Sequence, residues 1–348
     1  MAGRRSQQRS GGSVTSIDVA AHVGVSQATV ARVFSSPDKV APATRERVEA
    51  AAAELGYVPN AIARSLKSQR TNIVAAVVPS VGEYWQHVLT AFSRQLAAMQ
   101  RQLLLFSFAD PSQIETVIGS LAQYRVDGVI LASANIDPGQ LSRAQAVPVP
   151  IVAFNQPAAA GVVPSVSVDN ARGMAELADH LVDVGVRTVR YVGGVSSTST
   201  DQQRYRGASE ALADAGIACP YDEAGGFAYA DGHAIAARLV DRGALPDAVM
   251  VAGDELAFGV IDGLEDRGVR VPDDVLITGF DGLPQAAWAG YDLTTLTQPT
   301  EALVTEAVDL LSTNDPGPAP AEFVAPGAVR LGRTTKLPAL PEPTENHA

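Results

Sequence analysis

The chain has 348 residues, of which 46% are hydrophobic and only 5% aromatic, a composition typical of an aliphatic-rich α/β protein with two or three domains. It contains no apolar run near the roughly 20 residues that a membrane helix needs, and its basic, polar start lacks the apolar stretch of a signal peptide, so we expect a cytoplasmic protein. The single cysteine, Cys219, excludes an intrachain disulfide and a metal site built from several thiolates.

The net charge of −12 is unevenly distributed along the chain. Residues 1–70 carry ten Lys and Arg against five Asp and Glu, which leaves a net charge of −17 on the remainder. This asymmetry favours a basic head that meets a polyanion, although chain termini are often basic by chance. Residues 1–13 are charged, rich in Gly and Ser and without periodicity, which predicts a disordered arm.

Residues 14–57 predict three short helices. The first begins at Thr15 in a capping-box pattern and ends at Gly24, because glycine adopts a positive φ without the steric strain that other residues have there. The second begins at Ser26, a good capping residue. The third covers PATRERVEAAAAELG, with proline at a first helical position and glycine at the C-terminal cap.

The spacing within VTSIDVAAHVGVSQATVARVF indicates a helix-turn-helix. Ala20 is small where two helices must cross closely, Gly24 lies in the turn, and Val25 and Val30 are placed to pack between the helices. From spacing alone, an ordinary helical hairpin remains an alternative. In a helix-turn-helix, the second helix points its N-terminal residues at base edges in the major groove.

Three side chains of that second helix could read DNA. The amide of Gln27 can make a bidentate contact with adenine, and the methyl group of Ala28 can contact a thymine methyl. Arg32, one turn later, could reach a guanine or a phosphate.

After Arg70, short β-rich apolar runs alternate with helical patterns. This alternation predicts βαβ units in two doubly wound lobes with mainly parallel sheets. The predicted strands are NIVAAVV (72–78), LLLFSF (103–108), VDGVILAS (126–133), VPIVAF (149–154), TVRYVGG (188–194), DAVMVAG (247–253) and VLITGFD (275–281). The predicted helices are 86–100, 170–184, 201–215, 231–242 and 256–267.

Several stretches, taken in their order and spacing, resemble the lactose-repressor/galactose-repressor (LacI/GalR) family of bacterial regulators over roughly residues 14–335. They are IDVAAHVGVSQATVARVF and VAPATRERVEAAAAELGYVPNAIARSL in the head, then RYRGASEAL, VAGDELAFGV, GFDG and LTTLTQP. The resemblance implies an all-α helix-turn-helix head plus an α/β core of two doubly wound parallel-sheet lobes, like those of periplasmic sugar-binding proteins, with a ligand between the lobes.

The resemblance divides the chain into segments. The helix-turn-helix covers 14–57, the hinge 58–71, core lobe 1 residues 72–165 and 297–323, and core lobe 2 residues 166–296 and 324–337. The Pro-rich tail 338–348 is expected to be disordered. No leucine heptad follows the core, so nothing in the sequence argues for a coiled-coil tetramer.

The hinge of such proteins folds into a short helix when two subunits meet on the operator, and a leucine from each subunit enters the minor groove. An apolar wedge of this kind unstacks a base step and bends the duplex. The matching residue is Leu66, with Ala63 one turn earlier. The residues that we expect to contact DNA are Thr15, Ser26, Gln27, Ala28, Thr29, Arg32, Lys39, Asn60, Ala63, Arg64 and Leu66.

The chain departs from the family pattern in two places. The family usually has serine at the cap before the third helix, where this chain has Ala41, at a cost of about 1 kcal/mol of helix stability. It often has asparagine just past the second helix, where this chain has Ser35 and Ser36.

Polar and aromatic residues that follow predicted strands are candidates for the ligand site, because open parallel sheets bind ligands beyond their strand carboxyl ends. Carboxylates, an amide and a guanidinium beside an aromatic face suit a polyol. By resemblance, Arg204, Asp254 and Asp281 match ligand-holding positions and Phe227 a stacking aromatic. The candidates are Tyr84, Trp85, Asn155, Arg204, Phe227, Asp254 and Asp281.

Each candidate has an alternative structural reading. Asp254 could cap the helix that follows it, Asp281 could belong to a turn, and Tyr84 and Trp85 could belong to the core. Trp288 is expected to pack within a lobe and is not a candidate.

The sequence argues against an enzyme and against a cofactor or metal. It has no G-x-G-x-x-G after a strand, no Walker sequence, no G-x-S-x-G elbow and no metal-ligand spacing of histidines. We expect a homodimeric repressor that binds near-palindromic double-stranded operator DNA and is released by a small-molecule effector, a sugar or related polyol. The alternatives are a corepressor-dependent regulator that senses a nucleoside or other metabolite, a sugar-binding protein without DNA function, and a sugar-modifying enzyme.

Overall fold

The computed structural model describes residues 14–58, 71–79, 82–108, 113–132, 149–156, 162–312 and 321–335. The chain forms two compact units, Met1–Thr71 and Asn72–Ala348. The predicted N-terminal arm, hinge residues 59–70 and the predicted C-terminal tail lie outside the described residues. In the described part of the chain, no helix is both long enough and apolar enough to span a membrane.

The N-terminal unit is helical, as predicted. Its apolar core is small and aliphatic, and it joins all three helices through Val19, Ala20, Val30, Val33, Val48, Ala51 and Ala52. Its elements are α1 (Ser16–Val23), α2 (Gln27–Ser35), the 3₁₀ turn η1 (Pro37–Lys39) and α3 (Pro42–Leu55).

The helix ends lie where the sequence predicts them. The backbone N–H of Thr15 donates to Asp18 at 2.9 Å in a capping box, and the hydroxyl of Ser26 caps α2 by accepting from a backbone N–H of its first turn. Gly24 and Gly56 end α1 and α3 with φ of 72° and 68°, the left-handed region. Ala41 precedes α3 and supplies no side-chain cap.

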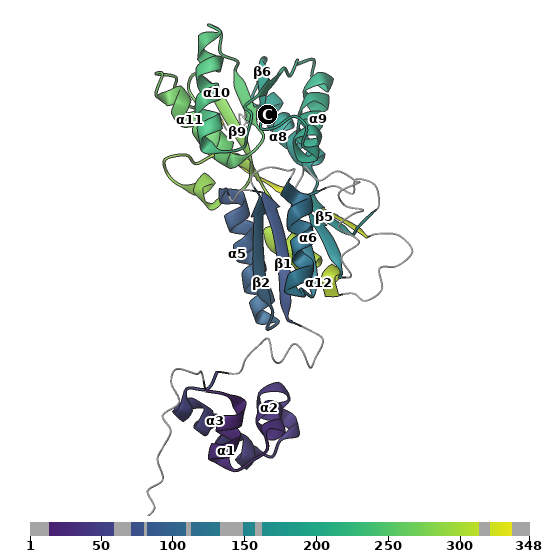
Figure 1. Ribbon diagram of the computed structural model, residues 1–348. Coiled ribbons are helices and arrows are strands. Elements are labelled where there is room, and N and C mark those ends of the chain that lie inside the picture. Colours follow the sequence, from purple (N-terminus) through teal and green to yellow (C-terminus); the bar gives the residue numbers. More distant parts are fainter. Residues whose placement is uncertain are drawn as a thin grey trace, which may run out of the picture. The chain divides into compact units, whose positions relative to one another are not determined.

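The first lobe of the core is a six-stranded parallel sheet in the order β11-β5-β4-β3-β1-β2 (Figure 1). Its strands are β1 (Ile73–Pro79), β2 (Gln102–Phe108), β3 (Gly128–Leu131), β4 (Ile151–Phe154), β5 (Ser165–Val168) and β11 (Glu322–Ala325). Its helices are α5 (Glu83–Ala98), α6 (Ile114–Tyr124) and α12 (Thr300–Ser312).

Helices cover both faces of this sheet, because side chains alternate between the faces of a strand. Val74, Ala76 and Val78 of β1 belong to the apolar cluster that includes α5 and α12. Ala75 and Val77 belong to the cluster that includes α6. Both faces of β1 are therefore buried, which explains its continuous apolar sequence.

The second lobe repeats this architecture, with sheet order β12-β10-β9-β8-β6-β7 and only β12 antiparallel to its neighbour among the described pairs. Its strands are β6 (Val189–Gly193), β7 (Tyr221–Glu223), β8 (Ala248–Val251), β9 (Leu276–Asp281), β10 (Thr294–Thr297) and β12 (Ala328–Arg330). Its helices are α8 (Asn170–Asp183), α9 (Ser199–Asp214), α10 (Tyr229–Asp241), α11 (Asp254–Glu265) and the 3₁₀ turn η3 (Pro284–Ala287).

The chain crosses between the lobes three times: from β5 to α8, from β10 to α12 and from β11 to β12. The lobe boundaries expected from the sequence fall inside elements. The expected boundary between residues 165 and 166 falls within β5, and the one between 323 and 324 falls within β11, and both of these strands belong to the first sheet. The expected boundary between residues 296 and 297 falls within β10 of the second sheet. Each crossover therefore lies one to three residues beyond the expected position.

The predicted fold class and the seven predicted core strands are confirmed. Two helices, α6 and α12, and five strands were not among the predicted elements: β5, β7, β10, β11 and β12. Most of these strands are short or rich in polar residues, such as SVSV in β5 and TTLT in β10, so they lack the apolar run that predicts a buried parallel strand.

Candidate functional site

The head presents the N-terminal part of α2 to solvent. Gln27, Ala28 and Arg32 are exposed, whereas Val30 and Val33 on the opposite side of the helix are buried against α1 and α3. In a helix-turn-helix, it is the N-terminal part of the second helix that meets base edges in the major groove.

The amide of Gln27 is held by its neighbour in α1. Its Nε2 donates to the hydroxyl of Ser16 at 3.0 Å. The hydroxyls of Ser26 and Thr29 lie 2.8 Å apart and are engaged in capping α2. Of the other predicted DNA contacts, two are exposed in the head, Thr15 and Lys39, while Asn60, Ala63, Arg64 and Leu66 lie outside the described residues.

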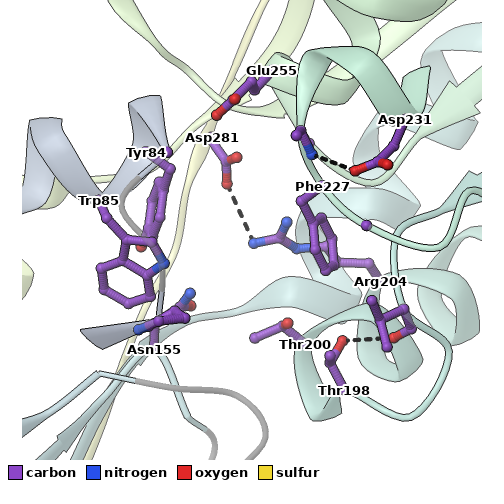
Figure 2. A pocket seen from close by; sticks show the side chains of 16 residues that line it. Tyr84, Trp85, Asn155, Thr198, Thr200, Arg204, Phe227, Asp231, Glu255 and Asp281 are labelled. Atoms are coloured by element: carbon purple, nitrogen blue, oxygen red, sulfur yellow. Dashed lines mark hydrogen bonds and ion pairs between the residues drawn. The ribbon is translucent and has the colours of Figure 1, made fainter. Parts of the chain in front are cut away.

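The core contains a pocket of about 470 Å³ between its two lobes (Figure 2). Segments that follow β1 and β4 of the first sheet line one side, and segments that follow β6, β8 and β9 of the second sheet line the other. The strand carboxyl ends of both sheets thus face the same cavity, the position at which open α/β sheets bind ligands. Six of the seven predicted ligand residues line it: Tyr84, Trp85, Asn155, Arg204, Phe227 and Asp281.

Aromatic and amide groups form the first-lobe side of the pocket. The rings of Tyr84 and Trp85 meet edge to face with centroids 5.0 Å apart. Asn155 follows β4 with φ of 55°, a left-handed conformation that asparagine tolerates better than most residues. The residue is 8% exposed, and its Oδ1 accepts no hydrogen bond from the described residues. Figure 2 shows these three side chains opposite Phe227 and Arg204.

The guanidinium of Arg204 organises the second-lobe side. Its Nε donates to Asn170 at 2.8 Å, and its terminal nitrogens donate to the backbone oxygen of Ala252 at 2.5 Å and to Asp281 at 3.4 Å. The guanidinium carbon also lies 3.9 Å from the ring centroid of Phe280. Arg204 is only 4% exposed, so these contacts replace the hydration of a buried charge.

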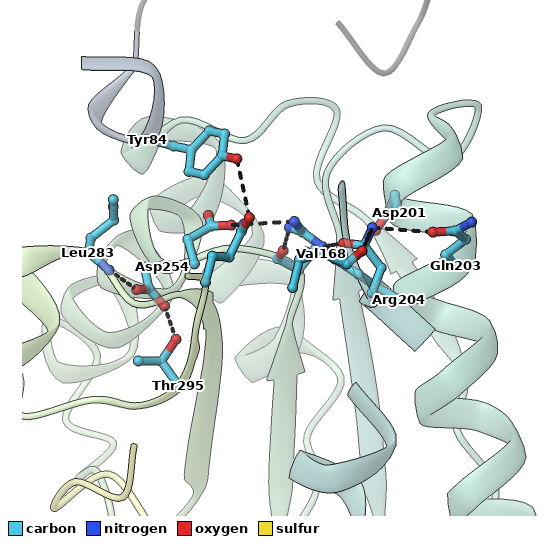
Figure 3. Close-up of polar contacts among 12 residues, drawn as sticks. Tyr84, Val168, Asp201, Gln203, Arg204, Asp254, Leu283 and Thr295 are labelled. Carbon is cyan, nitrogen blue, oxygen red and sulfur yellow. Dashed lines mark hydrogen bonds and ion pairs between the residues drawn. The ribbon is translucent and has the colours of Figure 1, made fainter. Parts of the chain in front are cut away.

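A line of polar contacts connects this guanidinium to the first lobe (Figure 3). Asp281 accepts from Gln298 at 2.7 Å, and Gln298 in turn accepts from the hydroxyl of Tyr84 at 3.3 Å. Burial raises the pKa of Asp281 to about 6, although Arg204 opposes that rise. Burial thus favours the uncharged form of this carboxyl group, whereas Arg204 favours the carboxylate.

Asp254 does not line the pocket, although it was among the predicted ligand residues. Its carboxylate is fully buried and accepts from the backbone N–H of Leu283 at 2.7 Å and the hydroxyl of Thr295 at 2.6 Å (Figure 3). Burial raises its pKa well above the usual range. Asp254 thus joins the start of α11 to the segment after β9 and to β10.

The pocket also contains polar residues that the sequence did not single out: Thr198, Thr200, Asp231 and Glu255. Thr198 caps α9, and Asp231 accepts from the backbone N–H of Ala228 at the start of α10. The run SSTST before α9 was a visible signal for the threonines. Trp288, expected to pack within a lobe, is instead 59% exposed.

The chain matches two family descriptions. "Bacterial regulatory proteins, lacI family" matches residues 17–60, and "Periplasmic binding protein-like domain" matches residues 178–335. HTH-type transcriptional regulator CelR of Thermobifida fusca is 34% identical over 307 residues, which cover 84% of this chain and 89% of CelR. Catabolite control protein A of Priestia megaterium is 30% identical over 304 residues, 86% of this chain and 92% of that protein.

Solved structures agree in fold. The lac repressor dimer bound to operator and the anti-inducer ONPF has a TM-score of 0.82 at 24% identity, and the match covers 93% of this chain and 99% of that one. The CelR–cellobiose complex has a TM-score of 0.68 at 30% identity, over 92% of this chain and all of that one.

We expect Asp254→Ala to destabilise the core rather than to act on ligand binding alone. The change leaves the backbone N–H of Leu283 and the hydroxyl of Thr295 buried without an acceptor, at a cost of about 1–3 kcal/mol for each such group. Thr295→Val, which removes one partner only, should cost less. Urea unfolding followed by tryptophan fluorescence measures both. A wild-type unfolding midpoint for Asp254→Ala would contradict this assignment.

Proposed function

The chain belongs to the lacI family of bacterial regulatory proteins, and we propose that it is a repressor whose operator binding is relieved by a sugar or related polyol held between its core lobes. The observation that supports this proposal is the presence in one chain of a helix-turn-helix whose second helix has an exposed N-terminal part and of a polar and aromatic pocket between two lobes. CelR of Thermobifida fusca, a relative, is named as an HTH-type transcriptional regulator.

Base reading is proposed for Gln27 and Ala28, at the exposed start of α2. The contact from Gln27 to Ser16 supports this role, because it limits the rotamers of a long, exposed side chain. One N–H of the Gln27 amide remains for adenine N7 while its oxygen accepts from adenine N6. Arg32 and Lys39, both exposed, are proposed phosphate or guanine contacts.

The chemistry of the pocket favours a ligand with several hydroxyl groups. Its polar lining offers acceptors in Asn155, Asp231 and Glu255 and donors in Arg204, Thr198 and Thr200, and a hydroxyl group can pair with either kind. The unpaired Oδ1 of Asn155 supports a donor group on the ligand beside β4. The Tyr84–Trp85 pair and Phe227 offer apolar faces for the C–H face of a sugar ring. CelR, a relative, has been solved with cellobiose.

Two further elements of the proposal come from the family. One helix-turn-helix reads only a few base pairs, so a homodimer on a near-palindromic operator is proposed. Leu66, outside the described residues, is proposed as the minor-groove wedge at the centre of that operator. A ligand that tightened operator binding instead of releasing it would identify a corepressor-dependent regulator, and would leave the pocket assignment intact.

Operator binding should depend strongly on salt, because each neutralised phosphate releases counterions. We expect retention on operator DNA in ~50 mM salt and its loss at ~200 mM. Arg32→Ala should weaken binding, whereas Arg206→Ala, an exposed arginine of the core, should not. Fluorescence anisotropy on a labelled fragment measures all three proteins. Equal binding by the two variants would argue against the assigned reading face.

Gln27→Ala should change the preferred operator sequence at one or two positions, since a bidentate glutamine–adenine contact is worth ~1–3 kcal/mol. Ser16→Ala should weaken the same preference by a smaller factor, because Gln27 is kept but no longer oriented. Ser35→Ala, exposed at the far end of α2, is the control. In vitro selection from random DNA gives the consensus of each protein. The same consensus for Gln27→Ala and wild type would sink the base-reading assignment.

A ligand at 100 times its dissociation constant should stabilise the protein by ~2.7 kcal/mol, which a thermal-shift screen of monosaccharides, cellobiose and nucleosides detects. The ligand that this screen identifies should alter the fluorescence of the Trp288→Phe variant, in which Trp85 remains, because Trp85 lines the pocket. It should not alter the fluorescence of Trp85→Phe, in which Trp288, outside the pocket, remains. Asn155→Ala should weaken binding about 10-fold, the loss of one buried hydrogen bond. A shift with nucleosides alone would replace the sugar assignment.

A further inference from the structure

The start of α5, in the first lobe, is held by side chains of the second lobe. Oε2 of Glu255, in the first turn of α11, accepts from the backbone N–H of Glu83 at 2.9 Å. The side chain of Glu83 in turn accepts from Nε2 of Gln285, in η3, at 2.6 Å. Both contacts are partly buried and lie beside the pocket. They join the lobes directly, without passing through the three crossovers.

Glu255 supplies the N-terminal cap that α5 lacks. The residue at the cap position is Gly82, which has no side chain to accept a hydrogen bond. The first N–H groups of a helix have no partner within the helix, and together they carry a partial positive charge. The carboxylate of Glu255 provides both an acceptor and a negative charge at that end. An element of the second lobe thereby caps a helix of the first.

A side chain at position 82 would disturb this contact. A Cβ there would lie 2.7 Å from Oε2 of Glu255, so the carboxylate end of that side chain would have to shift. The backbone conformation does not itself require glycine, since φ is −89°. Gly82 therefore leaves room for a carboxylate that reaches across from the other lobe.

Glu255 differs in this respect from the other pocket acids. Asp231 accepts from Ala228 within its own lobe at 3.1 Å, and Asp281 reaches the first lobe only through Gln298. Glu255 both lines the cavity and contacts the opposite lobe. Among the described residues its Oε1 makes no hydrogen bond, so one oxygen can serve a ligand while the other holds α5.

We propose that Glu255 is a positioning residue that sets the relative orientation of the two lobes by capping α5 across the pocket. The same carboxylate then senses both the ligand and the lobe orientation. Its consequence for operator affinity rests on the function proposed above, whereas the contact itself does not. Any ligand group that donates to Glu255, a hydroxyl or an ammonium, acts on the contact that orients the lobes.

Hydrogen–deuterium exchange of the full-length, ligand-free protein tests the contact. Glu255→Ala should speed exchange in the first turn of α5 at least 5-fold, and Glu255→Gln, which keeps an acceptor but loses the charge, should restore part of the protection. Gly82→Ala should also speed exchange, although it keeps the pocket carboxylate. Glu265→Ala, which removes an exposed acid at the other end of α11 and outside the pocket, is the matched control and should leave α5 unchanged. Unchanged exchange in both Glu255→Ala and Gly82→Ala would overturn the proposal.

Operator titrations of the same proteins, without ligand, test the consequence. Glu255→Ala and Gly82→Ala should shift operator affinity at least 3-fold in the same direction, and Glu265→Ala should not. Faster exchange with operator affinity within 2-fold of wild type would overturn the control of DNA binding by Glu255. If wild type itself binds no operator, the proposed function fails, while the exchange data still decide whether Glu255 caps α5.

Discussion

Arg204 carries a positive charge at a depth where only 4% of the residue is exposed, and a charge without partners there would destabilise the core by several kcal/mol. Its acceptors come from separate parts of the chain: Asn170 at the start of α8, Ala252 after β8 and Asp281 at the end of β9. Because one guanidinium needs all three acceptors, these three segments are held in place relative to α9. The second-lobe side of the pocket takes its shape from that requirement.

Much of the fold and of the pocket could be predicted, because the relevant signals are local in the sequence. Gly24 and Gly56 predict helix ends, because the left-handed φ at a helix C-terminus is one that other residues avoid. The continuous apolar sequences of β1 and β8 predict strands that are buried on both faces. The rule that ligands bind beyond strand carboxyl ends then locates Asn155 and Asp281, since each follows its strand directly.

The remaining features depend on contacts that are distant in sequence. Asp254 and Glu255 are adjacent acids, and successive residues of a helix point about 100° apart, so only the position of α11 decides which one lines the pocket. The buried strand β10 has the polar sequence TTLT. Its threonine hydroxyls are bonded, since Thr294 donates to the backbone oxygen of Gly332 and Thr295 donates to the carboxylate of Asp254. Partners up to 41 residues away make these threonines acceptable inside a sheet, and no local pattern reports them.

The three crossovers between the lobes limit how the core can move. A single flexible linker would let one lobe turn about it in many directions, whereas three connections restrict the orientations that the two lobes can take relative to one another. A ligand between the lobes can therefore shift the balance only among the orientations that all three connections allow, and only by the difference in its affinity for them.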